Sequence, residues 1–238
     1  MKSLIGAGIG AVALVLSLGS LANAQTPLNN FRIEGGAGYD IGNADLNTTT
    51  NIGGTPVTLK ANLIGSGGFA ANAALWYDGA FGPPGTFPGD ISIGLQYLHF
   101  SNDGTLSESG GGVSASATLS RGTNAAMADV EWRPRDGRFH PFVGAGLGAA
   151  FTSINISAGI GGIGGIGGGG GSLPTDNEVS FAAQGFFGFD YDFTSNLYGG
   201  VTGTFFYTDA DYTKLIPGVK LNIAYQELAV MAHLGWKF

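Results

Sequence analysis

Hydrophobic and polar residues alternate along residues 227–238, which read E-L-A-V-M-A-H-L-G-W-K-F. One face carries no charge and holds Leu228, Val230, Ala232, Leu234, Trp236 and Phe238; the other holds Glu227, Ala229, Met231, His233, Gly235 and Lys237. Because successive side chains of a strand point to opposite faces, this period of two predicts a β-strand. An uncharged face that ends on an aromatic residue is typical of the closing strand of a membrane barrel, although soluble sheets also alternate.

The same pattern recurs along the chain and predicts eight strands in total. The other seven are expected at residues 31–41, 69–78, 91–97, 125–133, 142–156, 179–191 and 197–208. All eight apolar faces lack Asp, Glu, Lys and Arg, whereas the opposite faces hold charged and polar groups. A soluble sandwich or lipocalin-type barrel also has short alternating strands, but it buries one apolar face in a core. The uncharged faces therefore favour contact with lipid.

The expected connections alternate between long and short. Long polar segments lie at 43–56, 101–122, 159–172 and 209–221, and shorter ones lie at 79–89, 135–138 and 194–196. Part of the second long segment still alternates and is able to extend the strands, and the third is a Gly-rich run that we interpret as a mobile loop. Long extracellular loops and short periplasmic turns are typical of outer-membrane barrels. The predicted fold is an all-β, eight-stranded antiparallel up-and-down transmembrane β-barrel.

The N-terminus has the pattern of a secretory signal peptide. Lys2 is the only charge before Arg32, residues 4–18 are apolar, and Ala22-Asn23-Ala24 supplies an A-x-A cleavage site. A single-span membrane anchor is the competing interpretation, but the apolar run is shorter than the ~18 residues that such a helix needs. We therefore expect a signal peptide at 1–24 and an outer-membrane β-barrel at 25–238.

Composition excludes several classes of function. The chain has no Cys, so it forms neither disulfides nor thiolate metal sites. Its formal net charge of −7 argues against a nucleic-acid partner, because phosphate binding requires clustered Lys and Arg. Only 11% of residues are charged and 44 are Gly, which suits strands and loops better than helices. We expect a monomer without a cofactor.

Eight charged residues share the inward parity of their strands and the same expected depth near the periplasmic end. They are Arg32, Glu34, Asp78, Asp129, Glu131, Arg133, Asp190 and Lys237. Since buried ions are costly unless paired, we hypothesise a network of mixed sign that closes the lower barrel. The alternative is that these charges are solvated in a wet lumen. An eight-stranded barrel has an interior just wide enough for side chains to fill, so a large open pore is not expected.

Three features of the sequence bear on ligand binding. Residues 144–149 match G-x-G-x-x-A, but they lie inside a predicted strand with no helix after them, so small residues facing a narrow lumen explain them better. Asp209-Ala-Asp211 lacks the Gly turn and distal Glu of a calcium loop. His140 and His233 have no partner at metal-ligand spacing. The sequence supports no metal site.

The segment His99-Phe100-Ser101-Asn102 resembles the H-x-S-N motif of outer-membrane lipid A deacylases. The resemblance implies that His99 is a base, Ser101 a nucleophile and Asn102 an oxyanion donor. The chain departs from that family because the motif lies mid-chain and the acidic Glu108 follows too early. An interfacial His beside a loop Ser is the alternative, and we expect no catalytic residue.

Three other segments resemble the small outer-membrane β-barrel family, which includes the OmpA-like transmembrane domain and the opacity-type porins. They are F-H-P-F-V-G-A-G-L-G at 139–148, the hairpin at 188–197, and the terminal W-K-F. The resemblance implies that Trp236 and Phe238 form a membrane-insertion signal for the barrel-assembly machinery. It also implies an outer-membrane location in a Gram-negative bacterium, contact with lipid and lipopolysaccharide, and a structural, surface-exposed or minor-porin role. A porin with an open channel is the alternative. We expect no peptidoglycan-binding domain after the last strand, so a wall-anchoring role is not implied.

Overall fold

The computed structural model describes residues 30–52, 55–64, 67–79, 89–110, 113–134, 137–161, 170–172, 176–216 and 219–238. The predicted signal peptide at 1–24 lies outside these residues. In the described ranges, no helix has the length and apolar character needed to cross a membrane.

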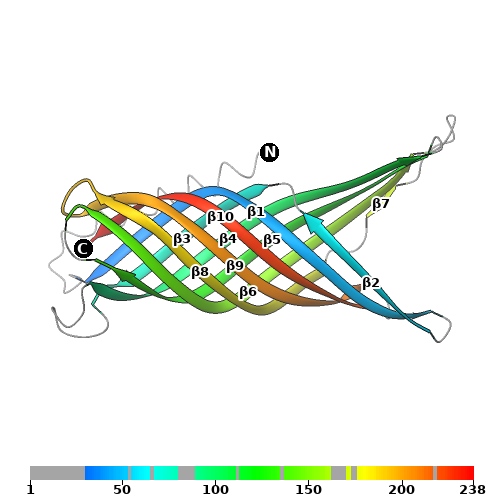
Figure 1. The fold of residues 1–238 in the computed structure, drawn as a ribbon, viewed down its shortest axis with the longest axis horizontal. Helices are drawn as coiled ribbons and strands as arrows, with labels where there is room; N and C mark the ends of the chain where they lie inside the picture. The colour runs from blue at the N-terminus through cyan, green and yellow to red at the C-terminus, as the bar shows by residue number, and fades with distance from the viewer. Residues whose placement is uncertain are drawn as a thin grey trace.

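The described residues form ten strands that belong to one antiparallel sheet (Figure 1). The strands are β1 (Phe31–Ile52), β2 (Thr55–Ile64), β3 (Gly68–Tyr77), β4 (Asp90–Gly110), β5 (Val113–Arg133), β6 (Phe139–Gly161), β7 (Gly170–Ser172), β8 (Asp176–Asp192), β9 (Leu197–Ile216) and β10 (Val219–Lys237). The β-branched and aromatic residues of these strands favour the pleated conformation of a sheet.

The sheet closes on itself because β10 pairs with β1, from Arg32↔Lys237 to Thr48↔Leu221. Two barrel strands are each built from two segments. The first consists of β3 and β2, which pair with the inner and the outer part of β1. The second consists of β8 and β7, which pair with the inner and the outer part of β6. The prediction of a closed eight-stranded antiparallel barrel is therefore confirmed.

The strands are longer than predicted, and three of the expected long loops are wrong. Residues 43–56, 101–122 and 209–221 mostly continue as hairpins, with the β4–β5 ladder running out to Gly110↔Val113. A paired ladder satisfies the backbone hydrogen bonds wherever two segments run side by side, whatever the polarity of their side chains. Composition alone therefore placed the strand ends too early. Of the expected Gly-rich loop, 159–161 belong to β6 and 170–172 form β7, while 162–169 lie outside the described residues.

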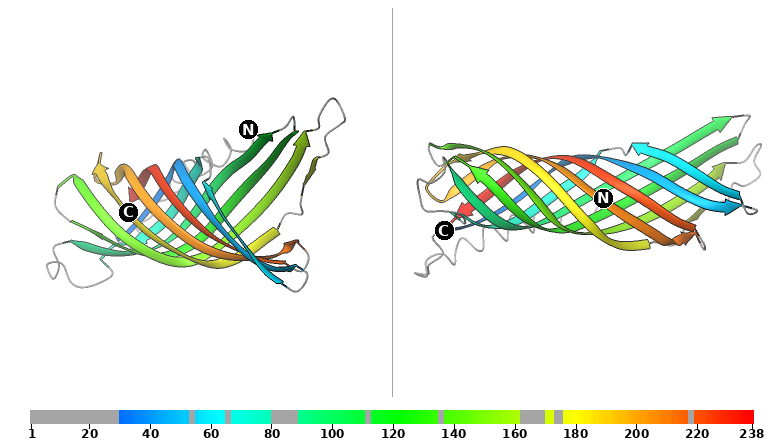
Figure 2. Two further views of the ribbon diagram at one scale, coloured as in Figure 1. Left: turned by 45° about the vertical axis from the view of Figure 1, so that its right-hand side comes forward. Right: turned by 60° about the horizontal axis from the view of Figure 1, so that its bottom comes forward.

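The outer ends of the strands separate into two arms (Figure 2). One arm contains β4, β5 and β6, and the other contains β9, β10, β1 and β2. The β3–β4 ladder ends at Phe69↔Ser101, and the β8–β9 ladder ends at Ala182↔Thr208. The barrel wall is thus continuous around its inner half and divided at its outer end.

The two faces of the wall differ in chemistry. Large hydrophobic side chains are exposed on the outside of every barrel strand, among them Tyr39, Leu75, Leu95, Val130, Leu147, Phe187, Phe205 and Val230. The inside holds buried charged and polar groups together with aromatic and aliphatic side chains. This is inverted relative to a soluble barrel and is the arrangement expected of strands in lipid.

Candidate functional site

Arg32 on β1 is the centre of a charge cluster inside the inner end of the barrel. The side chain is fully buried, and its Nε donates a 2.9 Å hydrogen bond to Asp78 Oδ1. Its Nη2 donates to Glu131 Oε1 at 2.5 Å, and its Nη1 lies 3.4 Å from Glu34 Oε2. One guanidinium therefore joins carboxylates from β1, β5 and the turn after β3.

Arg133 on β5 extends the same cluster across the lumen. Its Nε donates to Glu131 Oε1 at 2.8 Å, and its Nη2 lies 2.9 Å from Asp190 Oδ2 on β8. Glu131 thus bridges two guanidinium groups. Opposite charges at these distances offset the cost of removing each ion from water.

Two residues without a predicted role complete this cluster. The Tyr198 hydroxyl donates to Glu34 Oε2 at 3.0 Å, and His233 contacts Asp190 Oδ1 through Nε2 at 2.6 Å. His233 Nδ1 also lies 3.1 Å from Thr202 Oγ1. The alternation of β9 and β10 already placed Tyr198 and His233 on the inner face, so parity was the signal that could have found them. We name Arg32, Glu34, Asp78, Glu131, Arg133, Asp190, Tyr198 and His233 the lower charge network.

Two of the eight predicted lumen charges have their hydrogen-bond partners outside the lower charge network, although the Lys237 ammonium lies 5.3 Å from the centre of the Tyr198 ring. Asp129 accepts a 2.6 Å hydrogen bond from Gln184 Nε2, which also donates to Gln96. Lys237 donates to both oxygens of Asp192 at 2.7 and 2.8 Å, and the same carboxylate contacts His140 Nε2 at 3.2 Å. The structure brings the other six together.

Apolar and aromatic side chains fill the lumen beyond the lower charge network. Trp76, Phe142 and Phe186 form one buried layer, and the Arg32 guanidinium lies 4.8 Å from the centre of the Trp76 ring. A larger apolar layer contains Leu98, Phe100, Met127, Phe206 and Met231 together with small alanines. The rings of Phe100 and Phe206 are 5.0 Å apart. Together these two layers form an apolar barrier in the middle of the lumen.

A second cluster of buried charges lies on the outer side of that barrier. Asn102 Nδ2 donates to Asp40 Oδ2 at 2.8 Å and to Glu227 Oε2 at 2.9 Å. Arg121 forms an ion pair with Glu227 and lies 4.5 Å from the centre of the Tyr225 ring. We name these five residues the upper charge network. The alternating pattern did not reveal this network, because Asn102 and Arg121 lie in an expected loop and Tyr225 lies outside every predicted strand.

The glycines of residues 144–149 are explained by clearance inside the lumen. A Cβ atom at Gly146 would overlap the Asp129 carboxylate, and one at Gly144 would overlap the Phe186 ring. Their alternation with outward-facing residues keeps the inner surface of β6 flat where large side chains from other strands cross it. The segment lies within a strand, as the sequence predicted, and the described residues that follow it belong to the rest of β6 and to the strands β7 and β8.

The three residues of the deacylase-like motif do not share one face. His99 Nδ1 lies 2.9 Å from the Asn124 side-chain oxygen, which is an amide and not a carboxylate. Asn102 points into the lumen and belongs to the upper charge network. The Asn102 amide is therefore on the other side of the wall from His99 and Ser101, where it cannot stabilise an oxyanion formed at Ser101.

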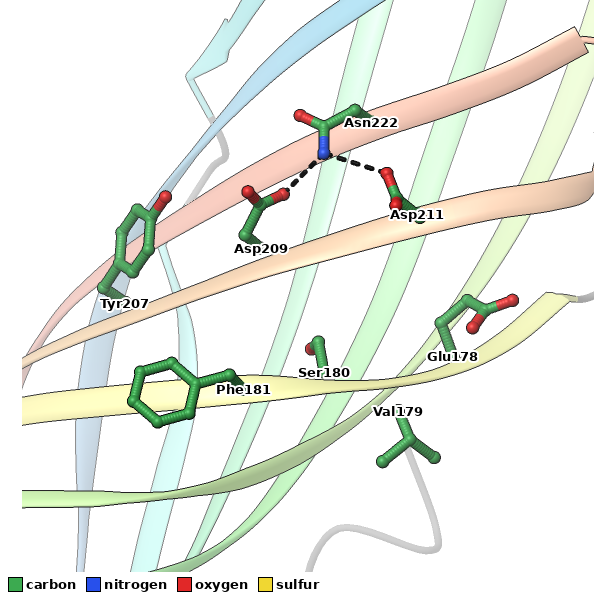
Figure 3. Close-up of a pocket in the computed structure, with 8 residues that line it drawn as sticks. All are labelled: Glu178, Val179, Ser180, Phe181, Tyr207, Asp209, Asp211 and Asn222. Atoms are coloured by element: carbon green, nitrogen blue, oxygen red, sulfur yellow. Dashed lines mark hydrogen bonds between the residues drawn. The ribbon is translucent and has the colours of Figure 1, made fainter.

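Asp209 and Asp211 lie on the outer part of β9. The Asn222 amide donates to Asp209 Oδ1 at 2.8 Å and to Asp211 Oδ1 at 3.0 Å (Figure 3). Among the residues that the structure describes, no group of three or more His, Cys, Asp or Glu is arranged to hold a metal ion.

The described fold can be compared with solved structures. The chain is structurally similar to small eight-stranded outer-membrane barrels. Neisserial surface protein A has 15% identity, and the match covers 88% of this chain and 97% of that protein with a TM-score of 0.42. The outer-membrane protein OprG from Pseudomonas aeruginosa has 10% identity, and the match covers 88% of this chain and 97% of that protein with a TM-score of 0.46. The outer-membrane protease OmpT from Escherichia coli has 13% identity, and the match covers 91% of this chain and 99% of that protein with a TM-score of 0.30.

No protein-family model matches the sequence, and no curated protein matches it either. Similarities at this level describe shared barrel architecture and carry no activity over to this chain.

Proposed function

We propose that this chain is an integral protein of the Gram-negative outer membrane whose closed barrel has a structural and surface-exposed role. One observation carries the proposal. The wall exposes large hydrophobic side chains on the outside of every barrel strand, and within the described residues its lumen contains two ion-paired networks separated by an apolar layer. Lipid suits the outside, while ions and water meet a barrier inside.

The predicted orientation gives the outer hairpins a role in display. With the N-terminus in the periplasm, the lower charge network lies at the periplasmic end. The long β1–β2, β4–β5 and β9–β10 hairpins then extend beyond the lipid on the cell surface. Their Ser-, Thr-, Asn- and Gly-rich sequences suit exposure to water.

We propose that the partners are outer-membrane lipid, lipopolysaccharide and the barrel-assembly machinery. Trp236 and Phe238 supply the terminal aromatic signal, and the Phe238 backbone N–H donates to the Phe31 carbonyl at 3.0 Å. This bond joins the end of the chain to the start of β1. Assembly at the closing strand would therefore be coupled to closure of the barrel.

Planar-bilayer conductance tests the closed-lumen proposal. Purified, refolded protein is expected to show no steady channel current in a KCl gradient, because the buried apolar layer around Phe100 and Phe206 separates the two charge networks in the described part of the lumen. A stable, ohmic conductance in the wild-type protein would contradict the proposal and support a small-solute porin instead.

The hydrolase alternative has its own test. Lipid A extracted from cells that carry the wild type is compared with lipid A from cells that carry Ser101→Ala. We expect identical acyl-chain profiles, because the Asn102 amide faces the lumen. Loss of a deacylated species in the variant would establish catalysis and overturn the proposed non-enzymatic role.

A further inference from the structure

The upper charge network contains more negative than positive charge. Its charged members are Asp40, Glu227 and Arg121, and the Arg121 guanidinium forms its ion pair with Glu227. The Asp40 carboxylate is fully buried, and its Oδ2 accepts a hydrogen bond from the Asn102 amide. Backbone N–H groups of Asp40 and Gly68 lie near the carboxylate, but among the described residues Asp40 Oδ1 has no hydrogen-bond partner. A buried carboxylate in this state is costly unless a cation compensates its charge.

The Asn102 side chain leaves a second oxygen atom without a hydrogen bond. Its Nδ2 donates to both Asp40 and Glu227, so the two carboxylates fix the orientation of the amide. Turning the amide over would place its oxygen against two negative groups. Asn102 Oδ1 therefore points away from them. The residue is only 6% exposed, and within the described part of the chain this oxygen has no hydrogen-bond partner.

The two oxygen atoms converge beside Gly68. This glycine is the first residue of β3, where it pairs with Asp40 on β1. A Cβ atom at Gly68 would overlap Asn102 Oδ1 and the Ser101 carbonyl oxygen, and it would lie 2.8 Å from Asp40 Oδ1. Because calcium–oxygen distances are about 2.3–2.6 Å, the two side-chain oxygens are close enough for one ion to contact both.

These oxygen atoms lie on the outer side of the apolar barrier. The β3–β4 ladder ends at Phe69↔Ser101, next to Gly68, and the wall divides into two arms beyond it (Figure 2). The apolar layer around Phe100 and Phe206 separates this end of the lumen from the lower charge network. An ion from the medium at the outer end therefore reaches the two oxygens without crossing that layer.

We propose that Asp40 and Asn102 bind one small, hard cation through their Oδ1 atoms, with water completing its coordination shell. Both side chains offer oxygen, which suits Ca²⁺ or Na⁺ better than a transition metal. One carboxylate and one amide make a weak site, with an expected Kd of about 10⁻⁴–10⁻³ M for Ca²⁺, the range of extracellular calcium modules. Such a site needs no cluster of three His, Cys, Asp or Glu residues, and the described residues contain none.

The test uses the refolded barrel in a non-ionic detergent after treatment with a chelator. The urea midpoint of unfolding is measured at increasing CaCl₂ or NaCl, and choline chloride keeps the ionic strength constant. Asp40→Asn removes the charge, and its amide is able to donate to Asn102 Oδ1. Asp103→Asn is the matched control, because it removes a charge at the exposed position next to Asn102.

CaCl₂ is expected to raise the midpoint of the wild type and of Asp103→Asn by roughly 0.5–1 M urea at ten times the Kd, because only the folded barrel presents the site. Asp40→Asn is expected to show no rise, and without added cation to unfold at a higher urea concentration than the wild type. A rise with NaCl alone would support the same site with sodium as its ion. A wild-type midpoint that responds to neither cation would overturn the proposal, whether or not the variant folds. An equal rise in Asp40→Asn would also overturn it, since the cation would then bind elsewhere.

Discussion

A buried guanidinium persists in a barrel lumen only where its charge is matched. Glu131 supplies the opposite charge for two arginines at once, since Arg32 and Arg133 both donate to its Oε1. Asp190 is shared in the same way between Arg133 and His233. Shared partners couple these residues, so their contributions to stability are not additive.

Replacement of Arg133 tests the lower charge network. Arg133→Ala leaves part of the charge on Glu131 and Asp190 uncompensated, and it is expected to lower the free energy of unfolding by roughly 3–5 kcal/mol. Urea titration of the refolded barrel measures this loss. Arg138→Ala, at an exposed position, is the control. Unchanged stability in Arg133→Ala would remove the network's proposed role.

Clearance inside the lumen predicts a second residue-level effect. Gly146→Ala places a methyl group against the Asp129 carboxylate and is expected to destabilise the barrel by about 1–3 kcal/mol. Gly185→Ala is the matched control, because a Cβ there meets no atom within 4 Å. The unfolding temperature of Gly146→Ala is expected to be clearly lower than that of Gly185→Ala. Equal unfolding temperatures would mean that the Asp129 side chain moves aside freely.

At the scale of the element, β10 combines three functions in one strand. Its inner face supplies Glu227 to the upper charge network and His233 to the lower one. Its outer face exposes Leu228, Val230 and Leu234. Its two edges pair with β1 and β9, so that the strand closes the wall.

A charge on the outer face of β10 should have an effect that depends on depth. Val230→Lys puts an ammonium group in lipid and is expected to cost about 2–4 kcal/mol near the midplane. Asn222→Lys lies on the same face but beside Asp209, beyond the apolar band, and is expected to cost little. Unfolding in phospholipid vesicles measures both. A similar cost at the two positions would contradict the placement of lipid around this face.

The whole molecule is held by closure of the ring. Every strand in the inner half has two neighbours, and the β1–β10 pairing removes the last open edge. Unpaired backbone groups in lipid cost several kcal/mol each, so a partly open barrel is strongly disfavoured.

Closure predicts that the folded barrel survives sodium dodecyl sulfate without heating and migrates differently after boiling. Ala232→Pro removes a backbone donor from a strand that is paired on both sides, opposite Ala37 of β1. This variant is expected to lose the unheated, fast-migrating species on gels, whereas the wild type keeps it. A wild-type protein with identical mobility before and after boiling would contradict a closed barrel.

The sequence by itself determined the number of barrel strands and which side of the wall each residue faces. Both are local properties, because side chains alternate along a strand whatever its neighbours are. The inward parity of Arg32, Glu131, Arg133 and Asp190 therefore followed from the sequence, as did the uncharged face that ends at Phe238. The lengths of the strands did not follow, because hairpin pairing continues through polar residues.

Only the tertiary structure decided which inward residues meet. Parity gives a side chain its face but not its depth, and depth depends on strand register and tilt around the whole barrel. The register places Glu131 between Arg32 and Arg133. It also brings Lys237 into contact with Asp192, and His233 into contact with Asp190. It also joins Arg121 and Glu227 above the apolar layer and ends the β8–β9 ladder at Thr208. These contacts connect strands far apart in the chain, so no local pattern encodes them.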